Sequence, residues 1–171
     1  MVAELLLARG FERIAFIAGL ERSSTSVERE RGFNEALAEA GRKVYRRAVG
    51  DYSFDGAQAA TRALFGAEGP APDALFVAND HMAIAAMDVL RNELALRVPE
   101  DVSVVGFDDV EGSAYLVPSL TTVRQPFEAV GRAAVRALLE AWRTPDEKAL
   151  APVAAVMPPE LMVRGSTGEH R

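Results

Sequence analysis

ALFVAND, residues 74–80, is the stretch that decides the fold. Its first five residues are all apolar, which is typical of a strand buried on both faces of a parallel sheet. Asn79 and Asp80 are helix-capping residues, and they precede a segment of helical character from about His81 to Leu94. A buried strand followed by a capped helix indicates a βαβ unit.

The same alternation extends to both sides of this unit. Further strands are predicted at residues 13–18 (RIAFIA), 44–49 and 102–107 (VSVVGF), and further helices at residues 1–9, 27–40 and 54–65. The alternating order predicts an α/β fold with a doubly wound parallel sheet.

The pattern changes after residue 107. A loop with a short helical piece leads to a predicted strand at 120–125, which continues into a long helix at 126–142. A last strand is predicted at 153–163, and Pro158-Pro159 assigns it to a sheet edge. Residues 165–171 are polar and are predicted to be a flexible tail.

Composition excludes several classes of function. The 171 residues contain 19 Lys+Arg and 25 Asp+Glu, a net charge of −6, with two histidines and no cysteine. Disulfide scaffolds, cysteine-ligated metals and thiol catalysis are therefore excluded. The motifs GxSxG, HExxH, GxxxxGK[ST] and GxGxxG after the first strand are also absent, so we expect no enzyme, no metal site and no cofactor.

The charge pattern also restricts the partners. An acidic chain whose longest basic runs are pairs such as Arg46-Arg47 lacks the footprint of a protein that binds DNA unaided. No stretch approaches about 18 apolar residues and no secretory signal is recognisable, so neither a membrane span nor export is expected. We expect a cytoplasmic protein.

Polar and aromatic residues follow the predicted strands at their carboxyl ends, where doubly wound sheets bind ligands. These segments are residues 23–29, Asp51-Tyr52, Asn79-Asp80, Asp108-Asp109 and residues 125–127. Fork-shaped donors and carboxylates suit hydroxyl groups, and rings cover apolar faces. This rim is therefore expected to bind a neutral polyhydroxyl or heterocyclic molecule.

Each of these residues also has a purely structural interpretation. Arg29 lies early in a helix, where a cation is unfavourable, but Glu28 and Glu30 could neutralise it. The Asn79-Asp80 pair could serve only as a cap, or Asp80 could cap while Asn79 faces the ligand. Asp108-Asp109 could form a simple turn, and Tyr52 and Phe127 could be packing residues.

Several longer motifs resemble the effector-binding core of the LacI/GalR family of bacterial transcription regulators. They are RERGF (29–33), VANDHMAIAAM (77–87), VPEDVSVVGFDD (98–109), PSLTTVRQPFEAVGRAAVRALL (118–139) and PPELMVRGST (158–167). Together they span nearly the whole chain in family order. VSVVGFDD followed by LTTVRQP is the most specific element.

The resemblance implies a periplasmic-binding-protein-like sensor whose two lobes close on a sugar, nucleoside or purine. The family's ligand contacts fall on Arg29, Tyr52, Asn79, Asp108, Gln125 and Phe127. A homodimer interface would include Ile84, Met87, Leu90, Tyr115 and Leu116, although these residues could equally form a buried core face. The effector itself, and whether it induces or co-represses, are not decided by the sequence.

The resemblance also implies a division of the chain. Residues 1–124 correspond to the C-terminal lobe, residues 125–148 to a strand-helix excursion into a mostly missing N-terminal lobe, and residues 149–164 to the return. The helix 126–142 is then expected to expose an apolar face. Operator DNA would be bound only through a headpiece absent from this chain. The alternative is a stand-alone sugar-binding protein of the periplasmic type.

Overall fold

The computed structural model describes residues 1–143 and 156–170. Its elements are α1 (Val2–Ala8), β1 (Ile14–Ala18), α2 (Ser24–Glu39), β2 (Arg46–Val49), α3 (Phe54–Gly66), β3 (Ala74–Val77), α4 (Asp80–Asp88), β4 (Ser103–Val105), β5 (Thr122–Arg124), α5 (Phe127–Arg143) and β6 (Glu160–Met162). A π-helical turn, Val89–Glu93, continues α4, and a 3-10 turn, Glu111–Ala114, lies between β4 and β5.

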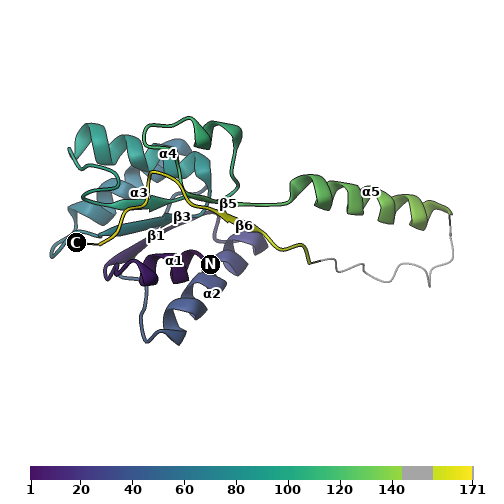
Figure 1. Ribbon diagram of the computed structural model, residues 1–171, viewed down its shortest axis with the longest axis horizontal. Helices are drawn as coiled ribbons and strands as arrows, with labels where there is room; N and C mark the ends of the chain where they lie inside the picture. The colour runs from purple at the N-terminus through teal and green to yellow at the C-terminus, as the bar shows by residue number, and fades with distance from the viewer. Residues whose placement is uncertain (144–155, 171) are drawn as a thin grey trace.

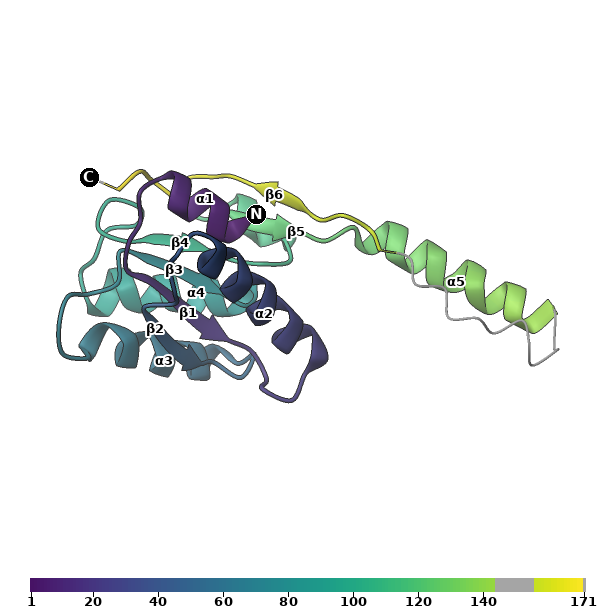
Figure 2. The same cartoon turned by 90° about the horizontal axis from the view of Figure 1, so that it is seen from below.

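Four parallel strands form the central sheet in the order β2-β1-β3-β4. Helices α1 and α2 cover one face, and α3 and α4 cover the other (Figures 1 and 2). This arrangement confirms the predicted doubly wound parallel sheet.

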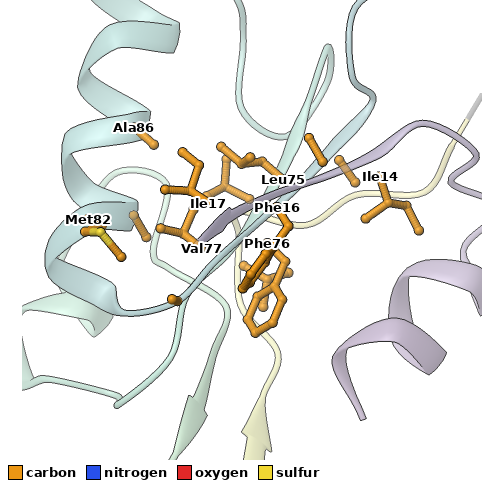
Figure 3. Packing of buried hydrophobic residues seen from close by; sticks show 14 of the residues in the cluster. Ile14, Phe16, Ile17, Leu75, Phe76, Val77, Met82 and Ala86 are labelled. Atoms are coloured by element: carbon orange, nitrogen blue, oxygen red, sulfur yellow. The ribbon is translucent and has the colours of Figure 1, made fainter. Parts of the chain in front are cut away.

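The two faces of the sheet bury different side chains. Phe16 of β1 and Phe76 of β3 are register partners whose ring centroids lie 5.3 Å apart, and Phe33 of α2 packs 4.8 Å from Phe76. On the opposite face the register partners Ile17 and Val77 point towards α4, as Figure 3 shows. Strands β1 and β3 carry only apolar side chains, and successive residues pack against helices on opposite faces of the sheet. This is what the all-apolar segment ALFV predicts.

Strands β5 and β6 carry the chain out to α5 and back. They pair antiparallel, and isolated parallel bridges from Val105 to Thr121 and from Asp108 to Arg124 place β5 beside β4. Helix α5 projects away from the lobe (Figures 1 and 2), and none of its residues is buried.

Some element boundaries differ from the predictions. Helix α4 starts at Asp80, and its regular part ends at Asp88 because the chain continues as the π-helical turn. The last strand is only three residues long, Glu160–Met162, against the predicted 153–163. Residues 153–155 of that prediction, and 144–148 of the predicted excursion, lie outside the described residues.

The flexible-tail prediction for residues 165–171 is wrong for the described part. The Val104 N–H donates to the Ser166 carbonyl at 2.8 Å, and Ser166 Oγ donates to the Val104 carbonyl at 2.6 Å. The His170 N–H donates to the Arg9 carbonyl at 3.0 Å. Polar side chains here complete the hydrogen bonding of the sheet edge, so their polarity did not indicate exposure.

No helix in the described part of the chain is long and apolar enough to cross a membrane.

Candidate ligand-binding site at the carboxyl ends of the strands

Arg29 of α2 occupies the centre of the predicted rim. Its guanidinium carbon lies 3.7 Å from the ring centroid of Phe107, and its Nη1 donates to the Ala78 carbonyl and, at 3.4 Å, to the Tyr52 hydroxyl. Its Nε is buried and has no hydrogen-bond partner among the described residues. A buried donor without a partner is costly, which is a common feature of a ligand site.

The structure decides how Arg29 relates to its acidic neighbours. Glu28 pairs with Arg31, and Glu30 pairs with Arg47 at 2.6 Å. The interpretation that Glu28 and Glu30 neutralise Arg29 is therefore wrong.

Tyr52 forms a wall beside Arg29. Its backbone is left-handed, with φ of 56°, and its ring lies across Gly19 at the end of β1. A Cβ at position 19 would lie only 2.1 Å from the ring, so this ring position requires glycine there. Tyr52 also packs against the core, so the predicted packing role holds for it, and its contact with a ligand stays a prediction.

The structure gives the capping role to Asn79 and not to Asp80. Asn79 is the N-cap of α4, because its Oδ1 accepts from the Met82 N–H at 2.9 Å. Its Nδ2 makes no hydrogen bond to the described residues, so a donor is left at the rim.

Asp80 is fully buried and is an acceptor that sequence reasoning assigned only to capping. It accepts from Thr122 Oγ1 at 2.5 Å, from Ser113 Oγ at 2.6 Å and from the Val110 N–H at 3.0 Å. Its carboxylate thus joins β5 and the loop after β4 to the start of α4. Gly106 makes room for it, since a Cβ there would lie 2.3 Å from Oδ1.

Asp108 and Gln125 form a polar pair on the same rim. Gln125 Nε2 donates to Asp108 Oδ1 at 2.6 Å, and the Asp108 N–H donates to the Val123 carbonyl at 2.9 Å. Burial raises the pKa of the Asp108 carboxyl, and the hydrogen bond from Gln125 and the charge of Arg29 act in the opposite direction. Asp108 has φ of 120°, a strained value for a residue with a side chain.

Phe127 stands at the edge of this group. It is the first residue of α5, its N–H donates to the Gln125 carbonyl at 2.9 Å, and it is 58% exposed. The packing interpretation of Phe127 is therefore wrong for the described chain. The rim brings Arg29 and Tyr52 into contact and pairs Asp108 with Gln125, while the Phe127 ring is at the surface.

The predicted interface residues divide into two groups. Leu90 is 0% exposed and Met87 is 5% exposed, so both belong to the core of this lobe. For Leu90, which lies in the π-helical turn that continues α4, the alternative of a buried core position holds, and the partner contact implied by the resemblance has no exposed surface to use. Tyr115, by contrast, is 78% exposed.

A surface hollow of about 260 Å³ lies beside this helix. It is lined by Ile84, Met87, Asp88, Arg91, Asn92, Leu116 and Val117. Three of the five predicted interface residues thus line one hollow, and Tyr115 adjoins it in the sequence.

Across residues 1–143 and 156–170, no group of three or more His, Cys, Asp or Glu side chains is arranged to hold a metal ion.

Comparisons with known proteins agree with this fold. Residues 3–167 match the family described as periplasmic binding protein-like domain. The HTH-type transcriptional regulator CelR of Thermobifida fusca is 42% identical over 163 residues, which cover 94% of this chain and 46% of CelR. The HTH-type transcriptional repressor PurR of Aliivibrio fischeri is 38% identical over 164 residues, which cover 94% of this chain and 48% of PurR.

Solved structures show the same relationship. A Lac repressor dimer bound to operator and an anti-inducer superimposes with a TM-score of 0.85 at 32% identity, over 97% of this chain and 56% of that one. A CelR-cellobiose complex gives a TM-score of 0.85 at 39% identity, over 96% of this chain and 49% of that one. The chain spans about half the length of the curated relatives it matches. It therefore belongs to the periplasmic binding protein-like domain family, within the LacI/GalR group of transcription regulators.

Proposed function

We propose that this chain is the effector-binding portion of a LacI/GalR-type transcription regulator, with the ligand held by Arg29, Tyr52, Asn79, Asp108, Gln125 and Phe127. One observation carries the proposal: Arg29 has a buried Nε without a partner among the described residues, on the rim where burial raises the pKa of Asp108. An arrangement that is unfavourable in the free protein is typical of a binding site.

The donor and acceptor set suits a sugar or a purine. Arg29 and Asn79 offer N–H donors, Asp108 and Gln125 offer oxygen acceptors, and Tyr52 offers a ring and a hydroxyl. The relative CelR is solved in complex with cellobiose, which supports the sugar class. We propose a small uncharged molecule of one of these two classes as effector.

We further propose that residues 125–148 belong to a second lobe. The apolar side chains of α5 are exposed, among them Phe127, Val130, Val135, Leu138, Leu139 and Trp142. A soluble domain rarely leaves such a face uncovered, and the curated relatives extend to about twice the length of this chain. The unmatched half of that length is the proposed cover, with residues 1–124 and 149–164 forming the first lobe.

The mechanism proposed for the intact regulator is a population shift. An effector bound between the lobes favours the closed state only by its difference in affinity for the closed and open states. Closure would then be transmitted to a DNA-binding headpiece. The net charge of −6 fits a chain that does not itself bind operator DNA.

A homodimer is proposed through the hollow formed by Ile84, Met87 and Leu116, with the exposed Tyr115 ring at its border. The structural relative bound to operator is a Lac repressor dimer, which supports this choice. A cytoplasmic location follows from the proposed role in transcription.

Catalysis and the periplasmic alternative are not favoured. The relatives are named as transcription regulators and not as enzymes or as stand-alone sugar-binding proteins. An enzyme hypothesis would regain support only from turnover that is lost in an Asp108→Ala variant.

Thermal-shift and calorimetric titrations with cellobiose and with hypoxanthine test the proposal. We expect a small, saturable rise in melting temperature with one of them, because a ligand that binds only the native state stabilises it by RT ln(1 + [L]/Kd). We expect weak binding, because the second lobe would supply half of the ligand contacts.

The matched variants are Asp108→Asn and Glu93→Gln. The first should weaken binding about tenfold or more, because it removes a charged acceptor. Glu93 forms an exposed pair with Arg62, so the second should leave binding unchanged. Equal binding to wild type and Asp108→Asn would contradict the assigned site, and tight binding to this chain alone would contradict the second-lobe proposal.

A further inference from the structure

Asp109 lies where the chain leaves the lobe towards α5 and where it returns. β5 and β6 make these two passages side by side (Figure 2). Arg124 is the last residue of β5, and Arg164 follows β6 by two residues. Asp109 lies between these two arginines.

The carboxylate of Asp109 uses one oxygen for each arginine. Its Oδ2 lies 2.6 Å from Arg124 Nε, and its Oδ1 lies 2.6 Å from Arg164 Nη2. Arg124 also contacts Glu160 of β6 at 3.6 Å, and Arg164 Nη1 donates to the Leu120 carbonyl at 2.9 Å. These contacts tie the outgoing and the returning strand to one carboxylate.

Burial distinguishes this cluster from the ion pairs on the surface. The Asp109 and Arg164 side chains are 6% and 16% exposed, and Arg124 is 47% exposed. In the Arg62–Glu93 pair, which has the same N–O distance of 2.6 Å, both side chains are at least 40% exposed. Water therefore screens the Asp109–Arg164 pair least, the Arg62–Glu93 pair most, and the Asp109–Arg124 pair to an intermediate degree. The two arginines accordingly lower the pKa of Asp109, in opposition to its burial.

The neighbouring residue connects this cluster to the ligand rim. Asp108 and Asp109 have φ of 120° and 55°, so two successive residues adopt left-handed backbone. This turn directs Asp108 to Gln125 and Asp109 to Arg124 and Arg164. A strained dipeptide keeps such a conformation only when its surroundings hold it in place.

We propose that Asp109 is a positioning residue that fastens β5 and β6 to the loop carrying Asp108, and so sets the Asp108–Gln125 pair of the effector site. The part of this inference that concerns the effector rests on the proposed function. A shift of the strands that lead to α5 would move Asp109 through its arginines, and with it the adjacent ligand residue.

Amide hydrogen exchange measured by NMR tests the fastening without any ligand. The Asp108 N–H bonds to Val123 of β5, and the Ala78 N–H bonds to Ile17 in the central sheet. In Asp109→Asn we expect protection of the Asp108 amide to fall about tenfold while that of Ala78 changes less than about twofold. Glu93→Gln, which breaks the exposed Arg62–Glu93 ion pair, should leave the protection of both amides unchanged.

A double-mutant cycle shows whether the effect passes through the ion pair. Arg124→Gln alone should resemble Asp109→Asn, and the double variant should lose little more protection than either single variant. Additive losses, or an equal loss at Ala78, would overturn the fastening, because they would mean independent or global destabilisation.

Binding of cellobiose or hypoxanthine, followed by NMR titration, tests the positioning. We expect Asp109→Asn to weaken the binding about tenfold although both oxygens of Asp109 are occupied by arginines. Unchanged affinity together with lost local protection would overturn the positioning role. If wild type binds neither probe, the proposed function fails, and the exchange result still decides whether Asp109 fastens the strands.

Discussion

Replacing Asp80 by alanine removes an acceptor on which three separate groups converge. Thr122 Oγ1, Ser113 Oγ and the Val110 N–H donate to it at 2.5, 2.6 and 3.0 Å, and the side chain is fully buried. The variant leaves three buried or half-buried donors without a partner and opens a small cavity beside Gly106.

The expected cost follows from these contacts. An unpaired buried donor costs about 1–3 kcal/mol, and removal of one partner of a buried charged network costs about 3–5 kcal/mol. We therefore expect Asp80→Ala to lower the free energy of unfolding by about 3–5 kcal/mol. For a chain of this length that corresponds to a melting temperature lower by about 6–20 °C.

Urea unfolding followed by far-UV circular dichroism measures the loss. The single tryptophan, Trp142, is 82% exposed on α5, so its fluorescence would not report on this core. Asp80→Asn keeps one acceptor oxygen and should give an intermediate loss, and Glu93→Gln should match wild type. A loss below about 1 kcal/mol for Asp80→Ala would refute the assignment of Asp80 as the central acceptor of this network.

Three further predictions test other parts of the structure. Burial raises the folded-state pKa of Asp108. The protonated Asp108 side chain therefore contributes to the stability of the fold at low pH, and this contribution is lost as the pH rises through the folded-state pKa. Asp108→Asn should therefore raise the urea midpoint relative to wild type more at about pH 7 than at about pH 3, and an equal difference at both would contradict the raised pKa. Ser166→Ala removes the Oγ that donates to the Val104 carbonyl and accepts from the Thr121 N–H. We expect differential scanning calorimetry to show a free energy of unfolding lower by about 1–3 kcal/mol. An unchanged free energy of unfolding would mean that the C-terminal residues do not dock on the sheet edge. Leu138 is 70% exposed, so Leu138→Glu should change the stability of this chain by less than about 0.5 kcal/mol; a large loss in urea unfolding would mean that α5 packs within the chain.

The layered fold could be predicted because it depends on a repeating signal. Every residue of β3 is buried, so ALFV carries no polar side chain, and the capping residue Asn79 marks the start of the next helix. The rim could be predicted for the same reason, since the residues after parallel strands share one edge of the sheet.

The parts that were predicted wrongly depend on contacts between distant segments. Asn79 and Asp80 are both good caps, and only the extended backbone of Asn79 decides that it caps while Asp80 turns inward. Ser166 looks like a tail residue until β4 and β5 supply its partners. The resemblance placed Leu90 at a partner interface, and only the packing of the folded lobe shows that the side chain is fully buried.

The central claim is that the carboxyl-end rim binds a small effector. Amide NMR spectra of this chain, recorded during titration with cellobiose and with hypoxanthine, test it most directly, because weak binding is still mapped to individual residues. We predict saturable shifts at Arg29, Asn79, Asp108 and Gln125 with one of the two ligands, and their loss in Asp108→Asn. Saturable shifts that cluster away from the rim, or shifts there that persist unchanged in Asp108→Asn, would contradict the account.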